Sequence, residues 1–309
     1  MFPIHENGVW GYIDQVGNIV VSPQFDNAYY GSEGLFGVKK NGKEGFLSIE
    51  NDNIPIKYDA VGEFHEGYCP MKIDNLWGAI NKRNEVIIPP VYTRVWHFSE
   101  GWVQAKTIEG VIQFLDTEGV VRLQFTDVSV GHFSHGLAFF TDKKTQRDGY
   151  INKEGELVIS STLFSSGYQF AEGLAPARHY SANKQCVINT SGDIVIEPVY
   201  DSIGFFSEGL CTFQRNGKTG YLNKTGDVVI PPLFDYASKF HEGTAYVVVE
   251  EQYGIINKLG EYIIEPKYTK YTGSDTQSAK QKLIRFRLGK KHIYVDRHTG
   301  DEIFQFDYL

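Results

Sequence analysis

Six glutamates occupy the same place in a repeated corner motif, and their type and spacing could support acid–base chemistry. They are Glu33, Glu66, Glu100, Glu172, Glu208 and Glu242, and a glycine follows each of them. General acid–base catalysis needs one differentiated pair of carboxyl groups, whereas these six are equivalent copies. We interpret them as acceptors for backbone N–H groups in turns, and we therefore expect no catalytic residue and no enzyme activity.

Metal and cofactor chemistry has little support in the sequence. His132 and His135 form the only close histidine pair. A metal would need further His, Cys or carboxylate ligands from other parts of the chain, and the sequence indicates none. Nucleophile, phosphate-binding and zinc-ribbon motifs do not occur. We therefore expect no metal and no cofactor, and no small-molecule ligand is indicated.

The elements that carry these residues are clearest in the segment 210–243, LCTFQRNGKTGYLNKTGDVVIPPLFDYASKFHEG. Asn216-Gly217 favours the positive φ angles of a two-residue hairpin turn after the first strand. A second turn begins at Asn223, whose side chain can bond backbone two residues on, and the third strand stops at two prolines. Gly220 leaves room for a neighbouring side chain or backbone to approach closely. The segment predicts a three-stranded antiparallel meander.

The marks of this segment recur along the chain. The corner glycines lie 33 to 37 residues apart, at Gly34, Gly67, Gly101, Gly136, Gly173, Gly209 and Gly243. The second strand reads Trp10-Gly11-Tyr12-Ile13 in the first copy and begins with Trp77-Gly78 in the third. This pattern resembles the WG (KWG) repeat family of bacterial proteins over nearly the whole chain. The resemblance implies tandem β units, but it brings no catalytic motif or ligand, so no functional residue carries over.

A unit of about 34 residues is too small to bury its own apolar faces, so each copy must pack on its neighbours. We interpret the chain as one array, with units at 1–34, 35–67, 68–101, 102–136, 137–173, 174–209, 210–243 and 244–280 and a capping unit at 281–309. We expect an all-β fold in which the meanders stack as an open β superhelix or solenoid. The alternative is a closed β-propeller of eight or nine blades. Both chain ends carry all three strands, whereas a propeller often completes one blade from both ends, and this favours the open array.

Charge, hydropathy and cysteine usage limit the partners and the compartment. The net charge of −8 works against nucleic-acid binding, which favours a basic face. No apolar run approaches the length of a membrane span, and no basic segment followed by an apolar stretch begins the chain. Cys69, Cys186 and Cys211 form no C-x-x-C motif, so we interpret them as core residues of a protein in a reducing compartment. We expect a cytoplasmic protein that binds neither nucleic acid nor membrane.

Units four to six differ from the other copies. The fourth loses its prolines at 122–125, and the fifth and sixth have longer first hairpins, which contain Lys143–Arg147 and His179–Lys184. Added length in repeat arrays collects on loops at one face, often the binding face, while drift in a tolerant hairpin is the alternative. Trp96 and Trp102 flank one corner and depart from neighbouring copies, which predicts an exposed aromatic patch. The candidate partner-binding residues are Trp96, Trp102, Lys143, Lys144, Arg147, His179, Tyr180 and Lys184.

These observations predict a non-enzymatic scaffold that presents an extended repeat surface to a protein partner, centred on units four to six. An immunity or antitoxin-type inhibitor of a bacterial toxin is one form of this hypothesis, suggested by size, acidity and the expected compartment. A carbohydrate- or cell-envelope-binding module is a second hypothesis, for which aromatic-rich β repeats are suited. A hydrolase with one carboxylate pair among the repeat loops is a third.

Overall fold

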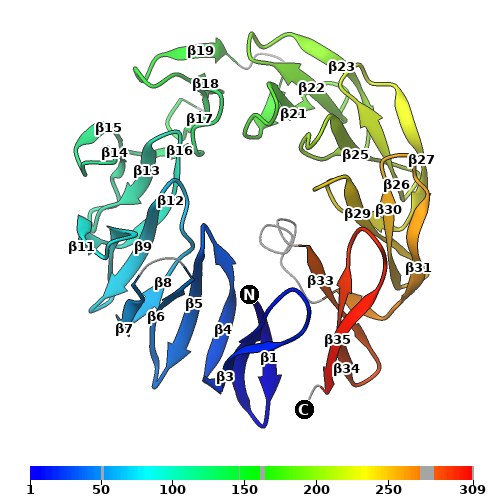
Figure 1. Ribbon diagram of the computed structural model, residues 1–309. Coiled ribbons are helices and arrows are strands. Elements are labelled where there is room, and N and C mark those ends of the chain that lie inside the picture. The colour runs from blue at the N-terminus through cyan, green and yellow to red at the C-terminus, as the bar shows by residue number, and fades with distance from the viewer. Residues whose placement is uncertain (50–51, 146, 161–163, 272–281, 308–309) are drawn as a thin grey trace. The chain divides into compact units, whose positions relative to one another are not determined.

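The computed structural model describes residues 1–49, 52–145, 147–160, 164–271 and 282–307. Within these ranges the protein is built from strands and contains no helix, as Figure 1 shows. The strands form nine antiparallel sheets, and the chain divides into two compact units. One unit is Met1–Val128 together with the residues from Phe306 onward, and the other is Ser129–Gln305. The all-β expectation is confirmed.

The first unit holds four sheets, each made of strands that are consecutive in the sequence. The first sheet contains β1 (Phe2–Glu6), β2 (Val9–Ile13) and β3 (Ile19–Phe25). The second contains β4 (Asn27–Ser32), β5 (Leu35–Lys40), β6 (Lys43–Ser48) and β7 (Ile54–Tyr58). The third contains β8 (Ala60–Val61), β9 (Tyr68–Ile73), β10 (Leu76–Asn81) and β11 (Val86–Tyr92). The fourth contains β12 (Arg94–Ser99), β13 (Trp102–Lys106), β14 (Ile112–Asp116) and β15 (Val121–Phe125).

The remaining five sheets follow the same plan and belong to the second unit, apart from Val128 at their start and the residues from Phe306 onward. The first two contain β16 (Val128–Val130), β17 (Ala138–Asp142), β18 (Arg147–Ile151) and β19 (Leu157–Ser160), then β20 (Phe164–Gly167), β21 (Leu174–His179), β22 (Gln185–Asn189) and β23 (Ile194–Tyr200). The next two contain β24 (Ser202–Ile203), β25 (Leu210–Arg215), β26 (Lys218–Asn223) and β27 (Val228–Phe234), then β28 (Tyr236–Ala237), β29 (Thr244–Val249), β30 (Gln252–Asn257) and β31 (Tyr262–Tyr268). The last contains β32 (Lys270–Tyr271), β33 (Leu283–Leu288), β34 (Lys291–Asp296) and β35 (Glu302–Asp307).

Each sheet after the first has four strands where the sequence predicted three. The additional strand comes from the segment that leads into the corner. In one sheet it is β24, which pairs with β25 at Ser202↔Gln214 and Ile203↔Phe213. Two residues are too few to show an apolar period, so the sequence pattern did not reveal this strand.

The fold class is the nine-bladed β-propeller named above as the alternative, because a four-stranded antiparallel meander is the blade of a propeller. The preference for an open superhelix depended on finding complete repeats at both chain ends. Within the described residues, the first sheet takes its strands from the N-terminal end alone and the last sheet from the C-terminal end alone. Complete end repeats are therefore compatible with propeller blades, and they do not indicate an open array.

The turns of the sheet β24–β27 agree with their sequence signals. Asn216 and Gly217 have φ angles of 53° and 75°, which are typical of a type I′ hairpin turn. The side-chain oxygen of Asn223 accepts the N–H groups of Thr225 at 3.0 Å and Asp227 at 2.9 Å. Both predicted turns are confirmed, and each has the local cause that was expected.

The signature glycine lies against a bulge in the last strand of its sheet. Thr219 pairs with Phe234 and Tyr221 with Ile230, so β27 advances four residues while β26 advances two. The extra backbone crowds Gly220, where a Cβ atom would lie 2.5 Å from the carbonyl oxygen of Ile230. Glycine is therefore required because backbone occupies the space of a side chain, and the predicted close approach is confirmed.

Two repeats that lack this glycine show how the constraint is relieved. Beside Gln113 the bulge is absent, and β14 and β15 pair without a break over three successive residue pairs. A long side chain fits because no extra backbone presses on it. Cys186 faces a strand that keeps the shift in register. There a small side chain is accommodated, and its thiol donates to the carbonyl oxygen of Ala177 at 3.4 Å.

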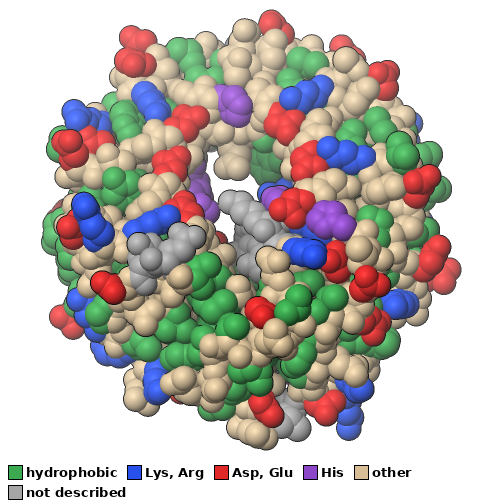
Figure 2. All heavy atoms as spheres, in the orientation of Figure 1, with side chains coloured by type: hydrophobic (Ala, Val, Ile, Leu, Met, Phe, Trp, Pro, Cys, Tyr) green, Lys and Arg blue, Asp and Glu red, His purple; other side chains and the backbone are tan. Residues whose placement is uncertain are grey.

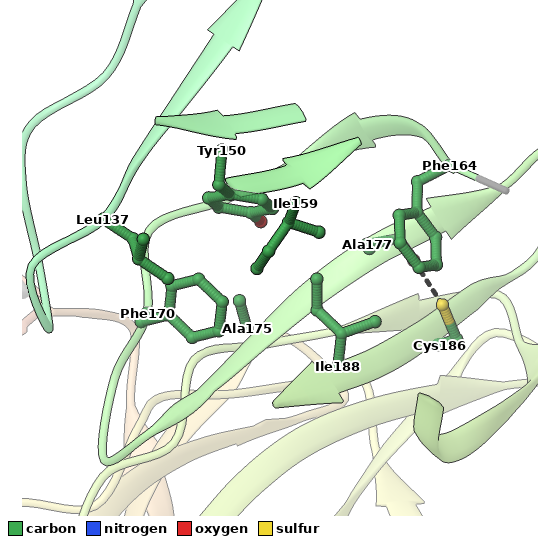
Figure 3. Packing of buried hydrophobic residues seen from close by; sticks show 9 residues of the cluster. All are labelled: Leu137, Tyr150, Ile159, Phe164, Phe170, Ala175, Ala177, Cys186 and Ile188. Carbon is green, nitrogen blue, oxygen red and sulfur yellow. Dashed lines mark hydrogen bonds between the residues drawn. The ribbon is translucent and has the colours of Figure 1, made fainter. Parts of the chain in front are cut away.

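The apolar core lies between successive sheets. Figure 3 shows a cluster in which residues at or beside β17–β19 meet residues of the next sheet: Leu137, Tyr150 and Ile159 against Phe164, Phe170, Ala175, Ala177, Cys186 and Ile188. Equivalent clusters join other neighbouring sheets within each unit. The prediction that a repeat buries its faces against its neighbours is confirmed. Cys69, Cys186 and Cys211 are buried in these clusters, as predicted, and burial raises the pKa of the Cys186 thiol to about 11.

Buried tyrosine hydroxyls add polar links between sheets. The hydroxyl of Tyr221 donates to the carbonyl oxygen of Ser238 in the next sheet at 2.7 Å. Tyr12 makes the same kind of bond to Gly37 at 2.8 Å. Since both rings are fully buried, each hydroxyl needs such a partner, and the bond fixes the position of one sheet against the next.

We expect Gly220→Ala to destabilise the protein, because the added Cβ atom would collide with the backbone of β27. The midpoint of urea unfolding, followed by circular dichroism, should fall by an amount corresponding to at least about 2 kcal/mol. Gln113→Ala is the matched control, because Gln113 holds the equivalent place beside a strand without a bulge. It should cost only about 1 kcal/mol, because it removes the acceptor of the Tyr92 hydroxyl, which donates to Oε1 of Gln113 at 3.0 Å. Equal losses in the two variants would contradict the steric explanation.

Candidate functional site

The corner glutamates have an unusual backbone conformation. Their φ angles lie between 49° and 56°, and those of the following glycines between 75° and 86°, in the corners of Glu33, Glu66, Glu100, Glu172, Glu208 and Glu242. Two successive left-handed residues form a type I′ turn, in which asparagine or glycine is the usual first residue. A positive φ angle is unfavourable for glutamate, so contacts of its side chain must compensate for the cost of this backbone conformation.

The side chain of a corner glutamate reaches the corner of the next repeat. Oε2 of Glu208 accepts the N–H of Gly243 at 3.0 Å. The two carboxylate oxygens of Glu66 accept the N–H groups of Glu100 and Gly101, each at 2.7 Å. The structural interpretation of these residues is confirmed, with one difference: the N–H groups belong to the neighbouring corner and not to the glutamate's own turn.

A lysine from the turn that precedes the last strand of a sheet completes several of these links. Nζ of Lys258 lies 3.0 Å from the carboxylate of Glu208 and donates to the backbone carbonyl of the same residue at 3.0 Å. The same two contacts join Lys82 to Glu33 and Lys224 to Glu172. Each of these corners is therefore held by a backbone donor and a cation together.

These contacts decide the ionisation of the corner carboxylates. Burial alone would raise the pKa of Glu208, but the hydrogen bonds from Lys258 and Gly243 outweigh it and hold the pKa below its ordinary value. Glu33 and Glu172 have lowered pKa values for the same balance of causes. A carboxyl group in this state remains ionised at neutral pH and has its oxygens occupied, so it is unsuited to the role of a general acid.

One corner departs from this plan. His135 takes the place of glutamate with a φ angle of 56°, and its Nε2 accepts the N–H of Gly173 at 3.0 Å. The ring nitrogen can accept only when it carries no proton. Thr190 stands where other repeats have the lysine. Among the described residues, no group of three or more His, Cys, Asp or Glu side chains is arranged to hold a metal ion.

The structure places the two candidate tryptophans on neighbouring strands of the first unit. Trp96 lies on β12 with the guanidinium of Arg94 4.8 Å from its ring. Trp102 lies on β13, 6.3 Å from the ring of Phe114. Both side chains are half-buried, so each presents only part of its ring to solvent.

The elongated hairpin around Lys143 and Lys144 connects β17 to β18 in the second unit. Asp142 starts its turn by accepting the N–H groups of Lys144 at 2.8 Å and Thr145 at 3.1 Å. Lys143 and Lys144 are exposed. Arg147 is the first residue of β18. The predicted extension is thus a compact turn that carries two exposed lysines.

The second elongated hairpin holds the same position in the next sheet, between β21 and β22. The backbone N–H of His179 donates to the carbonyl of Lys184 at 2.9 Å, and Arg178 donates to the Asn183 carbonyl at 3.1 Å. Lys184 forms an ion pair with Asp201. Tyr180 projects from this ordered loop with 54% of its surface exposed. The structure therefore brings the two hairpins to equivalent places in consecutive sheets of one unit.

An exposed aromatic pair in the second unit was missed by the sequence analysis. Tyr168 and Phe205 are 42% and 37% exposed, and their ring centroids lie 6.1 Å apart in an edge-to-face arrangement. Phe205 stands directly before Phe206, the residue two places ahead of the corner glutamate Glu208, where other repeats have Glu63, His97 or Lys239. An aromatic residue at a place otherwise occupied by polar side chains was the available signal.

The surface that Figure 2 displays shows acidic and basic side chains interspersed, without a large patch of one sign. This mixture agrees with the lysine–glutamate pairs of the corners and with pairs such as Lys218 and Asp235 at 2.5 Å. In the part of the chain that the structure describes, no helix is long and apolar enough to cross a membrane. The face that Figure 2 displays therefore has no single-sign patch that would attract one class of ligand.

The family model described as WG containing repeat matches residues 10–43, 53–77, 77–107, 149–180, 187–218, 220–252 and 253–277. These segments include the signature glycines and the corners described above. Among curated proteins, no significant match was found.

A solved structure shares the fold at low sequence identity, and a second was matched with a lower TM-score. A crystal structure described as the eukaryotic initiation factor aligns over 99% of this chain and 95% of that chain, with 12% identity and a TM-score of 0.65. BamB from Moraxella catarrhalis aligns over 88% of this chain and 94% of that chain, with 12% identity and a TM-score of 0.47. At 12% identity, the similarity to the initiation factor structure concerns the fold alone.

Acid should weaken the corner links in a defined direction. The folded pKa values of Glu33, Glu172 and Glu208 are depressed, so their contribution to stability is present above the unfolded pKa and is lost as pH falls through the folded pKa. A variant with all three replaced by glutamine should have a lower urea midpoint than the parent at about pH 7, and this difference should shrink towards about pH 3. A difference that does not change with pH would contradict this origin of stability.

A missing link can be built into the His135 corner. We expect His135→Glu combined with Thr190→Lys to raise stability by about 0.5 to 1 kcal/mol, because the pair would reproduce the contacts of Glu208 and Lys258. Thr190→Lys alone should give no gain, since it would face no carboxylate. The measurement is a double-mutant cycle on urea midpoints. Additive single effects would argue against the pairing.

Proposed function

Because the chain belongs to the WG-containing repeat family, whose repeats it matches in both compact units, we propose that it is a non-enzymatic scaffold that binds a protein partner through its repeat loops. The observation that carries the proposal is the pair of elongated hairpins at 143–147 and 179–184, which occupy equivalent places in consecutive sheets. Their exposed residues include Lys143, Lys144 and Tyr180. The core lies between the sheets, so loops can vary without loss of packing.

We favour inhibition of a bacterial toxin as the specific form of this function. An acidic chain with a net charge of −8 is suited to a basic partner, and complementary charge speeds the encounter of two proteins. Co-expression with a toxin encoded beside the gene should restore growth of the host cell. Continued killing of the cells, with both proteins present at equal levels, would reject this form.

Carbohydrate recognition is a second candidate because Tyr168 and Phe205 present exposed rings side by side. Aromatic side chains supply the apolar contact of many small-ligand sites, with polar groups fixing orientation. Binding on a glycan array that disappears in Phe205→Ala would support this candidate. Silence of the array would remove it.

The principal test compares partner capture by the intact chain and by a chain whose two elongated hairpins are replaced with Asn-Gly turns of the kind at Asn216-Gly217. We expect recovery of the partner from the native cell extract to fall at least about tenfold, because interface energy concentrates in a few side chains. The matched control replaces Glu250-Glu251, a turn at the same position in another sheet, with Asn-Gly. It should leave recovery unchanged. Equal recovery by all three chains would reject the hairpins as the binding site.

A further inference from the structure

The last strand of each sheet is an edge, and most of these edges are blocked by proline. The prolines are Pro23 in β3, Pro55 in β7, Pro89 and Pro90 in β11, Pro198 in β23, Pro231 and Pro232 in β27, and Pro266 in β31. Proline has no N–H to offer, and the accompanying bulge distorts the ladder. Such strands cannot readily pair with a further strand.

The strand β15 is an edge without this protection. It lies at the end of its sheet beyond β14, and among the described residues no strand pairs with its other side (Figure 1). Its five residues contain no proline, and its pairing with β14 has a single shift in register, between Leu123 and Val121, whereas the proline-bearing β27 has two against β26. The backbone is therefore regular enough to accept another strand.

Two other proline-free edges are less suitable. The strand β19 has only four residues, so it offers a shorter edge than β15, although the two strands share the same single shift in register. The strand β35 begins with Glu302 and ends with Asp307, and charged residues of this kind discourage pairing at an edge. Arg122, the charged residue of β15, is compensated by Asp116, whose Oδ2 lies 2.7 Å from its Nε and 2.5 Å from its Nη2.

We propose that β15 accepts an extended peptide of a partner protein as an additional strand. Main-chain hydrogen bonds would supply the affinity, and exposed Val121 would favour a β-branched residue beside it. Exposed Glu118 and Asp127 lie just outside the two ends of β15, so the peptide that fits best carries basic residues at its ends.

A second copy of the chain is a poorer occupant of the same edge. Each copy brings a net charge of −8 and the same acidic residues at the ends of β15, so the two would repel. A strand of five residues also buries far less than the roughly 1,000 Å² that a stable interface between two folded chains needs. A flexible peptide needs only its own length of edge.

The test uses the full chain and a fluorescein-labelled peptide of alternating threonine and valine with lysine at each end. Two further forms of the peptide are N-methylated at alternate amides, and binding is followed by fluorescence anisotropy. Alternate residues of an added strand point their N–H groups toward β15, so one methylated form should bind at least about tenfold more weakly while the other binds like the parent. Equal affinities of the two forms, or no binding of the parent peptide, would overturn the proposal.

Substitutions at Val121 locate the binding edge. Val121→Lys should weaken binding of the basic peptide about fivefold or more through like charge, whereas Val121→Glu should not weaken it. Val228→Lys is the matched control, because Val228 pairs with Leu222 as Val121 pairs with Leu115, but on a strand that contains two prolines. It should leave binding unchanged. Equal losses in the two lysine variants would overturn the assignment to β15.

Sedimentation of the chain without peptide tests the second-copy alternative. The chain should remain a monomer, whereas self-association that disappears in Gln124→Pro would assign the edge to another copy and overturn the peptide proposal. Circular dichroism checks that Gln124→Pro remains folded. If it does not fold, self-association that disappears in Val121→Lys decides the same question.

This inference rests on the proposed binding function, but the two can fail separately. The chain with both hairpins replaced should bind the peptide with unchanged affinity. If the intact chain does not bind the peptide but recovers its natural partner normally, only the role of β15 is overturned. Partner recovery that is indifferent to the hairpins but lost in Val121→Lys would overturn the hairpin site and support the role of β15.

Discussion

The central constraint on this protein is that no sheet has a core of its own. Each small antiparallel sheet has apolar side chains that only a neighbouring sheet can cover, as the cluster of Tyr150, Phe170 and Ile188 illustrates. Burial of apolar surface is non-directional, so it holds neighbouring sheets together without fixing the position of one sheet against the next. Hydrogen bonds across the same junctions fix this position, such as the one that the Tyr221 hydroxyl donates to the carbonyl oxygen of Ser238.

The corner glutamates follow from the same constraint. A residue such as Glu208 adopts a backbone conformation that asparagine or glycine would adopt more easily. Only a longer side chain from that position can reach the backbone of Gly243 in the next corner. Glutamate at this place stabilises the contact between two repeats, although its positive φ angle is unfavourable within its own turn. The ion pair with Lys258 makes this contact partly ionic. At His135 histidine replaces glutamate and Thr190 stands at the lysine position, so this corner is joined to the next by the hydrogen bond from Gly173.

Much of the fold could be predicted from local chemistry, because its turns depend on residues that act on their own backbone. Asn216-Gly217 and Asn223 are examples, and the requirement for Gly220 was visible in the repeat itself. The short strand β24 was not visible because two residues carry no period. The distinction between superhelix and propeller was equally inaccessible, since it depends on the geometry between sheets and not on any pattern within one.

The candidate site was predictable in position but not in detail. Insertions located the hairpins around Lys143 and Tyr180, yet the turn that Asp142 organises and the ion pair of Lys184 depend on side-chain geometry. His241, directly before the corner glutamate Glu242, is half-buried, and burial lowers the pKa of its imidazole, which its place in a turn did not indicate. The exposed ring of Phe205 was not predicted, because most phenylalanines of the repeats are buried and the sequence alone does not distinguish an exposed one.

The three buried thiols have a consequence for studying how the molecule opens. Cys69, Cys186 and Cys211 each lie in a different junction between two sheets, and each is fully enclosed. An alkylating reagent can reach such a sulfur only while the two sheets around it are parted. The native chain thus carries a reporter of local opening at each of three junctions between sheets. The rate of alkylation at each cysteine would rank the three junctions by how often they open.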